Sequence, residues 1–218
     1  MIDIVQEIET AQREVASGRI AAGEGRSVRL SRTYDAPIEE VWDAVTSPER
    51  ISRWFLPVTG DYRVGGRFQL EGNAGGEILS CDRPNRFRVT WAYGDVTDPA
   101  AVSELEVRLT PVGDGTTRLE LDHTAIAPEE MWTEYGPGAV GVGWDQGLLG
   151  LTLHLRGESV GDSMAWQLSD EGRAFAAASS AAWGAANETA GADPAVAAKG
   201  VANTTLFYAP EKEAEAPS

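Results

Sequence analysis

His123 is the residue of this sequence best suited to acid-base chemistry near neutral pH. It continues the alternation of Leu119 and Leu121, so its side chain is expected on the same inward face of a strand, opposite Glu120 and Asp122. An imidazole with an ordinary pKa near 6.5 could transfer a proton there, provided that a partner lies within hydrogen-bond reach. The sequence identifies no such partner, and a lone inward histidine is more often a hydrogen-bonded structural residue, so both roles stay open.

The other residues that could carry chemistry form no recognised catalytic or metal-binding pattern. Two histidines and one cysteine, without Cys-x-x-Cys or His-Glu-x-x-His spacing, argue against a transition-metal site, and we expect neither a metal nor a cofactor. There is no Gly-x-Ser-x-Gly elbow, no phosphate-binding loop and no dinucleotide fingerprint. Cys81 is expected on a strand as a small core residue, and His154 as a packing or capping residue.

Charge and composition narrow the class of protein. A chain of 218 residues with 42% hydrophobic content and seven tryptophans can bury one sizeable core, which predicts one main domain. A formal net charge of −16 opposes binding to nucleic acid or to an anionic membrane surface. The single cysteine, and an N-terminus without a basic region followed by an apolar run, predict a cytoplasmic protein. A homodimer is left open.

The elements that must position His123 are organised around a predicted helix over residues 137–155. At about 100° per residue its apolar side chains form two stripes on nearly opposite sides: Val140, Trp144, Leu148, Leu151 and Leu155 on one, Val142, Leu149 and Leu153 on the other. Such a helix must be covered on both sides. Gly143, Gly147 and Gly150 run between the stripes and predict a close approach by another backbone. The length also suits a membrane span, against which polar residues such as Asp145 argue.

Upstream of this helix, hydrophobic periodicity predicts two kinds of element. Residues 2–17 have helical spacing and end at Gly18, which predicts an amphipathic helix outside the main fold, followed by a linker up to residue 25. A strand is expected over 26–34, and proline and acidic starts predict short helices over 35–46 and 47–55. Period-two alternation between residues 60 and 126 predicts an antiparallel meander with one solvated face.

Downstream, the composition shifts to alanine, serine and glycine with widely spaced aromatic residues. Residues 158–209 are therefore expected to form a helical extension, and Phe175 and Trp183, with Ile4 and Ile8 from the N-terminus, are the apolar groups available to cover the second stripe. The polar residues 210–218 are expected to form a mobile tail. The predicted organisation is thus 1–25 helix and linker, 26–157 main domain, 158–209 extension packing on that domain, and 210–218 tail.

The order of elements and several segments together resemble a known family. The segments are RTYDAPIEEVWDAVTSPERISRWFLP, RVGGRF, GEILSCDRPNRFRVTW, ELEVRLTP and TRLELDHT. Residues 26–156 thereby resemble the domain shared with activators of the heat-shock protein 90 ATPase, in the superfamily of START lipid-binding domains, polyketide cyclases and birch-pollen allergens. The resemblance implies an α+β helix-grip fold: a curved antiparallel sheet wrapped around a long C-terminal helix, with two short helices and here an additional helical extension.

The resemblance also implies a cavity between the sheet and the long helix. The residues then expected to bind a ligand are those facing inward from the sheet and the helix, or closing the mouth: Trp54, Phe68, Trp91, Tyr93, His123, Trp132, Trp144, Leu148 and Leu151. Inward aromatic residues also fill the cores of proteins, so the alternative is an interior that side chains fill completely.

Three functions follow from this resemblance, and the fold name alone does not choose among them. The favoured interpretation is a binding protein whose partner is a hydrophobic or aromatic small molecule, with no nucleic acid and no membrane. The second is an enzyme of the polyketide cyclase or hydrolase kind that uses His123 as acid or base. A regulator of a chaperone ATPase ranks last, because the separate N-terminal domain through which eukaryotic activators contact their chaperone has no counterpart in this sequence.

Overall fold

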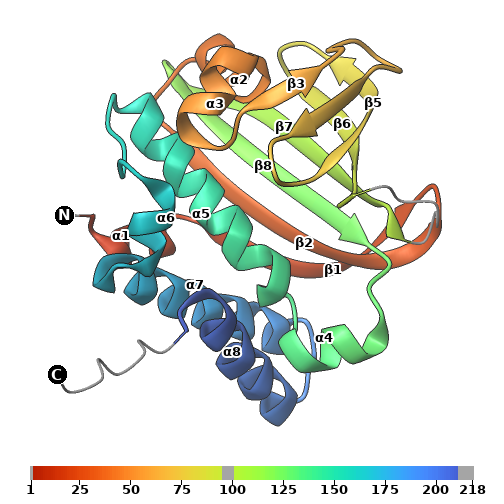
Figure 1. Cartoon of the computed structure of the whole chain (residues 1–218), viewed down its shortest axis with the longest axis vertical. Coiled ribbons are helices and arrows are strands. Elements are labelled where there is room, and N and C mark those ends of the chain that lie inside the picture. The colour runs from red at the N-terminus through yellow and green to blue at the C-terminus, as the bar shows by residue number, and fades with distance from the viewer. Residues whose placement is uncertain (1, 95–100, 211–218) are drawn as a thin grey trace, which may run out of the picture.

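An eight-stranded antiparallel sheet curves around helix α5, Gly138–Leu155 (Figure 1). The computed structural model describes residues 2–94 and 101–210. In spatial order the strands are β1 (Gln12–Ile20), β2 (Gly23–Tyr34), β8 (Thr116–Ala125), β7 (Ser103–Gly113), β6 (Arg86–Trp91), β5 (Gly75–Asp82), β4 (Arg67–Leu70) and β3 (Val58–Gly60). This arrangement confirms the predicted helix-grip fold.

Two short helices, α2 (Ile38–Thr46) and α3 (Pro48–Trp54), lie at one end of the sheet near α5 (Figure 1). Glu39 and Glu40 occupy the first turn of α2, where the helix dipole favours acidic side chains. Pro48 starts α3, because a proline at the first helical position costs no hydrogen bond. A further short helix, α4 (Glu129–Tyr135), connects β8 to α5.

The N-terminal segment differs from the prediction. The helix expected over residues 2–17 is limited to α1, Ile4–Glu9, and the following residues form β1, which pairs with β2 from Gln12↔Ser31 to Ile20↔Gly23. Gly18 therefore does not end a helix; it lies where a Cβ would come within 2.5 Å of the Thr124 hydroxyl. The linker expected up to residue 25 forms the turn between β1 and β2 and the first residues of β2. Because pairing with β2 at the edge of the sheet stabilises this segment as a strand, helical spacing in the sequence could not decide this element.

The C-terminal extension forms three helices, α6 (Ser163–Leu168), α7 (Asp170–Thr189) and α8 (Pro194–Tyr208). Helix α7 lies along α5, and α8 packs against α7, α4 and the first turns of α5 (Figure 1). The buried Leu149 and Leu153 of α5 pack with Phe175 of α7, and Ile4 and Ile8 of α1 pack against this cluster. The second apolar stripe of α5 is thus removed from water by the extension and by α1. Of the tail expected over 210–218, residues 211–218 lie outside the described residues.

Glycines let other groups approach α5 closely at two positions. A Cβ at Gly150 would lie 2.4 Å from the backbone carbonyl oxygen of Trp54, so α3 crosses the helix there, as the glycine stripe predicts. A Cβ at Gly141 would lie 2.2 Å from the ring of Trp183. No helix within residues 2–94 and 101–210 is both long and apolar enough to cross a membrane.

A buried carboxylate, Asp145 of α5, joins three elements. Arg13 of β1 donates two hydrogen bonds to it, Nε to Oδ2 at 3.0 Å and Nη2 to Oδ1 at 2.9 Å. Ser179 and Trp183 of α7 also donate to Oδ2, the indole at 3.0 Å. The Arg13 and Asp145 side chains are only 6% and 3% exposed, so the ion pair is desolvated and geometrically constrained.

We predict that Asp145→Ala lowers the free energy of unfolding by about 3–5 kcal/mol, because the change leaves the Arg13 guanidinium buried without its counter-ion. Urea denaturation followed by tryptophan fluorescence measures the loss. Glu24→Ala is the control: it breaks the pair between Arg19 and Glu24, whose side chains are 79% and 84% exposed, and should change stability little. Equal effects of the two substitutions would contradict the role assigned to Asp145.

Candidate functional site

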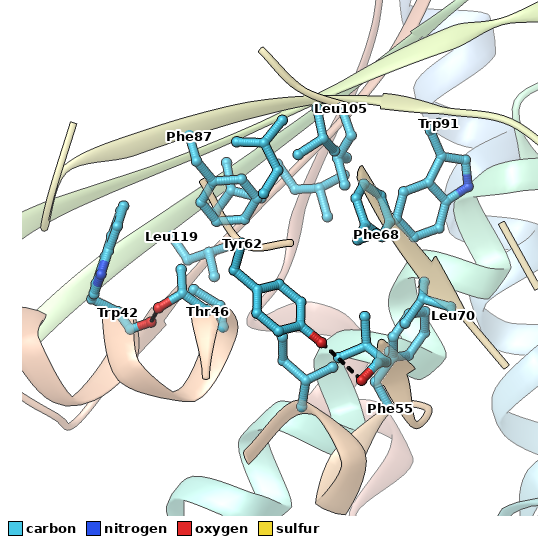
Figure 2. A pocket seen from close by; sticks show the side chains of 18 of the residues that line it. Trp42, Thr46, Phe55, Tyr62, Phe68, Leu70, Phe87, Trp91, Leu105 and Leu119 are labelled. Atoms are coloured by element: carbon cyan, nitrogen blue, oxygen red, sulfur yellow. Dashed lines mark hydrogen bonds between the residues drawn. The ribbon is translucent and has the colours of Figure 1, made fainter. Parts of the chain in front are cut away.

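A cavity of about 380 Å³ lies between the sheet, α2, α3 and α5 (Figure 2). Figure 2 shows aromatic side chains at both ends of this space, Trp42 and Phe87 at one and Phe68 and Trp91 at the other, with Tyr62 between them. The floor comes from the inward side chains of β7 and β8, which are Leu105, Val107, Leu119 and Leu121. The walls are therefore almost entirely apolar.

A glycine on the cavity side of α5 leaves part of this space unfilled. Trp144 and Leu148 line the cavity from the helix, and Gly147 between them contributes no side chain to fill it. A Cβ at Gly147 would lie 3.6 Å from the ring of Phe55, which is ordinary van der Waals contact, so a small side chain would fit there. The lack of a side chain at this position adds to the free volume.

Three of the polar groups of the cavity form hydrogen bonds within the protein. Thr46 donates its hydroxyl proton to the carbonyl oxygen of Trp42 at 2.7 Å, and Tyr62 donates to the carbonyl oxygen of Val58 at 2.9 Å, as the dashed lines in Figure 2 mark. The indole of Trp54 donates to the carbonyl oxygen of Ala44 at 2.9 Å. Among the described residues, no aspartate, glutamate or histidine lines the cavity, so its walls offer mainly apolar contact, and Cys81 and Arg83 are exposed polar groups at its edge.

His123 lies behind the cavity wall as part of a hydrogen-bond chain. The indole of Trp144 donates to its Nδ1 at 2.9 Å, and its Nε2 lies 2.7 Å from the Ser103 hydroxyl, which donates to the carbonyl oxygen of Trp91 at 2.7 Å. Because an indole N–H only donates, Nδ1 must accept, and the ring proton is on Nε2. Burial lowers the pKa of His123 to about 4, with Asp122 acting weakly in the opposite direction. The imidazole is therefore neutral, fully bonded and structural.

Five of the residues predicted to bind a ligand line the cavity together, and they share an inward direction from the sheet or the helices: Trp54, Phe68, Trp91, Trp144 and Leu148. Leu151 is completely buried but lies in the core beside the cavity and not on its wall. Tyr93 is 67% exposed, so its inward placement was wrong. Strand β6 ends at Trp91, and alternation does not continue beyond the end of a strand.

Trp132 and His123 lie at a second, smaller hollow of about 70 Å³ near α4 and not at the cavity. The guanidinium of Arg26 stacks on the Trp132 ring, 4.7 Å from its centroid. Trp132 therefore does not close the cavity mouth. The rings of Trp91 and Trp144 stand between the two spaces, because both line the cavity and both contact the His123 ring.

The sequence interpretation missed several lining residues. Phe87 shares the inward phase of Trp91, and Trp42 lies on the apolar side of a predicted helix, so both could have been included from periodicity. Tyr62 is in the loop between β3 and β4, where no periodic signal exists. Cys81 is exposed and lines the cavity, so its expected place in the core was wrong.

Comparisons with known proteins agree with this geometry. A family model described as "Activator of Hsp90 ATPase homolog 1-like protein" matches residues 35–156. The crystal structure of CalU16 from Micromonospora echinospora is 38% identical, with 82% of this chain and 98% of that chain covered and a TM-score of 0.62. Its solution NMR structure is 37% identical over 82% and 96%, with a TM-score of 0.67. Protein MLL2253 from Mesorhizobium loti, 24% identical over 62% and 100% with a TM-score of 0.51, shares the fold. A search of curated proteins found no match.

We predict that His123 makes stability depend on pH below neutrality. Its pKa is about 4 in the folded chain and near 6.5 when unfolded, so the unfolded chain binds more protons in this window and stability falls as pH falls. His123→Gln, whose amide can both accept and donate, should abolish a loss of roughly 3 kcal/mol between pH 7 and pH 4. Melting temperatures across this pH range measure the effect.

The matched control is His154→Gln, at the half-buried second histidine, which should leave most of that pH dependence in place. At pH 7, His123→Ala should be less stable than His123→Gln, because it leaves the Trp144 indole N–H without an acceptor and the Ser103 oxygen without the donor at Nε2. A variant His123→Gln with an unchanged pH dependence would show that another group titrates.

Proposed function

This chain belongs to the family of Activator of Hsp90 ATPase homolog 1-like proteins, and on that premise we propose that it binds a hydrophobic or aromatic small molecule in the cavity. The observation that carries the proposal is the apolar lining of a space of about 380 Å³, within the size range of small-molecule sites. Water in such a space has few hydrogen-bond partners on the walls, so an apolar ligand that displaces it gains free energy. The single exposed cysteine suits a reducing compartment, and a cytoplasmic location is part of the proposal.

Aromatic rings at the inner end of the cavity favour a ligand with a ring of its own. Trp91 and Trp144 have ring centroids 5.0 Å apart, and Phe68 lies 6.1 Å from Trp91 and Phe55 6.3 Å from Trp144. These separations are those of tilted and stacked aromatic pairs. A planar ligand that packs against these rings extends an existing aromatic cluster.

Binding is favoured over the alternative of a polyketide cyclase or hydrolase-like enzyme by the position of His123. The residue contacts the far side of the Trp91 and Trp144 rings, and both of its ring nitrogens are already bonded. It has neither access to a ligand in the cavity nor a free position for proton transfer. Regulation of a chaperone ATPase has support from the family description alone.

We predict that Leu148→Trp fills the cavity and weakens binding of the neutral fluorescent probe N-phenyl-1-naphthylamine at least tenfold while the protein stays folded. Leu148 lines the cavity and is 4% exposed, so a larger side chain from α5 must occupy the ligand space. Fluorescence titration measures the binding. The control Val140→Trp places the same side chain on the same helix but away from the cavity, and it should leave the Kd of the probe unchanged. If Leu148→Trp unfolds and the wild type binds no probe, the interior is solid and the proposed function fails.

A further inference from the structure

We propose that the cavity selects amphipathic anions, with the apolar body of the ligand inside and its anionic group bound by Arg83 at the mouth. This inference rests on the proposed function, because it names the chemical class of ligand for the same cavity. Arg83 lies in the turn between β5 and β6 and was not singled out by the sequence pattern.

The mouth is marked by the lining residues that solvent reaches. Tyr62 is 47% exposed, and Cys81 and Arg83 are exposed as well, whereas Trp91, Leu121 and Leu148 at the interior walls are buried. A ligand that buries its apolar part against the walls therefore leaves its other end near the β5–β6 turn. The polar end of a bound molecule would therefore lie beside Arg83 at the mouth of the cavity.

Arg83 differs from arginines such as Arg88, which pairs with Glu104 and Glu106, and Arg50, which pairs with Glu40 and Asp43. Among residues 2–94 and 101–210, no carboxylate lies within 4.0 Å of the Arg83 guanidinium. In the part of the chain that the structure describes, Arg83 is thus an arginine without a carboxylate partner at the cavity entrance, in a protein with 34 acidic and 18 basic residues.

The other polar groups of the mouth do not substitute for Arg83. The Tyr62 hydroxyl proton is donated to Val58, and a cysteine thiol is a weak donor. A guanidinium carries five N–H donors in a planar fork that matches carboxylate and phosphate oxygens. Asp82, the preceding residue, does not line the cavity. An anionic group is consequently the ligand end that gains most at this position, and a neutral ligand gains nothing from the charge.

Two probes that differ by one anionic group test the inference. N-phenyl-1-naphthylamine is neutral, and 1-anilinonaphthalene-8-sulfonate has the same ring system with a sulfonate added. We expect Arg83→Gln to raise the Kd of the sulfonate probe about three- to tenfold, and its binding to lose most of its sensitivity to salt, because a charge-assisted contact is removed. The Kd of the neutral probe should stay unchanged. Arg19→Gln removes the same charge at the β1–β2 hairpin and should affect neither probe.

Three outcomes separate the inference from the function on which it rests. If both probes bind and Arg83→Gln leaves the sulfonate probe unchanged, the inference is wrong and the binding function stands. An equal loss in Arg83→Gln and Arg19→Gln shows an effect of overall charge and also overturns the inference. If neither probe binds the wild type, the proposed function itself fails, and the inference fails with it.

Discussion

The desolvated ion pair of Asp145 with Arg13 is the constraint on which the rest of the structure depends. One carboxylate accepts hydrogen bonds from β1 and from two residues of α7, and it is carried by the helix at the centre of the fold. Apolar contacts alone fix the rotation of α5 weakly, because both of its sides are hydrophobic. A rotation that separated Asp145 from its donors would leave a buried charge unpaired, so the pair sets which stripe faces the cavity.

A second buried carboxylate extends this constraint to the N-terminus. Glu7 of α1 pairs with the buried Arg32 of β2, and its other oxygen accepts from Arg156 at 3.1 Å, just after α5 ends. The two acidic residues thus join the middle of the central helix and the residue after its C-terminal end to the same two-stranded hairpin. α1 and β1 are thereby joined to the rest of the folded chain, and α7 of the extension is held to α5 through Asp145.

The fold could be predicted because it depends on patterns that are local in the sequence. The alternation over residues 60–126 and the two stripes of α5 indicate which faces are buried, without identifying the elements that cover those faces. The partners of a buried charge are not local in the sequence, since Arg13 and Asp145 are 132 positions apart. From the sequence alone, Asp145 argues only against a membrane span. Of the site, periodicity gives the inward direction of Trp91 and Trp144. It gives neither the end of β6 before Tyr93 nor the separation of His123 from the cavity, because strand ends and ring stacking are tertiary properties.

The hydrogen-bonded wall of Trp144, His123, Ser103 and Trp91 makes the cavity blind at its inner end. A molecule that enters from the β5–β6 turn would meet the Trp144 indole, which cannot turn aside without breaking its bond to His123. The hollow at Trp132 lies beyond that barrier. For the proposed function, this wall limits the length of the chain or ring system that the cavity can hold, and a relative with a smaller residue in place of Trp144 would have a deeper cavity that admits longer molecules.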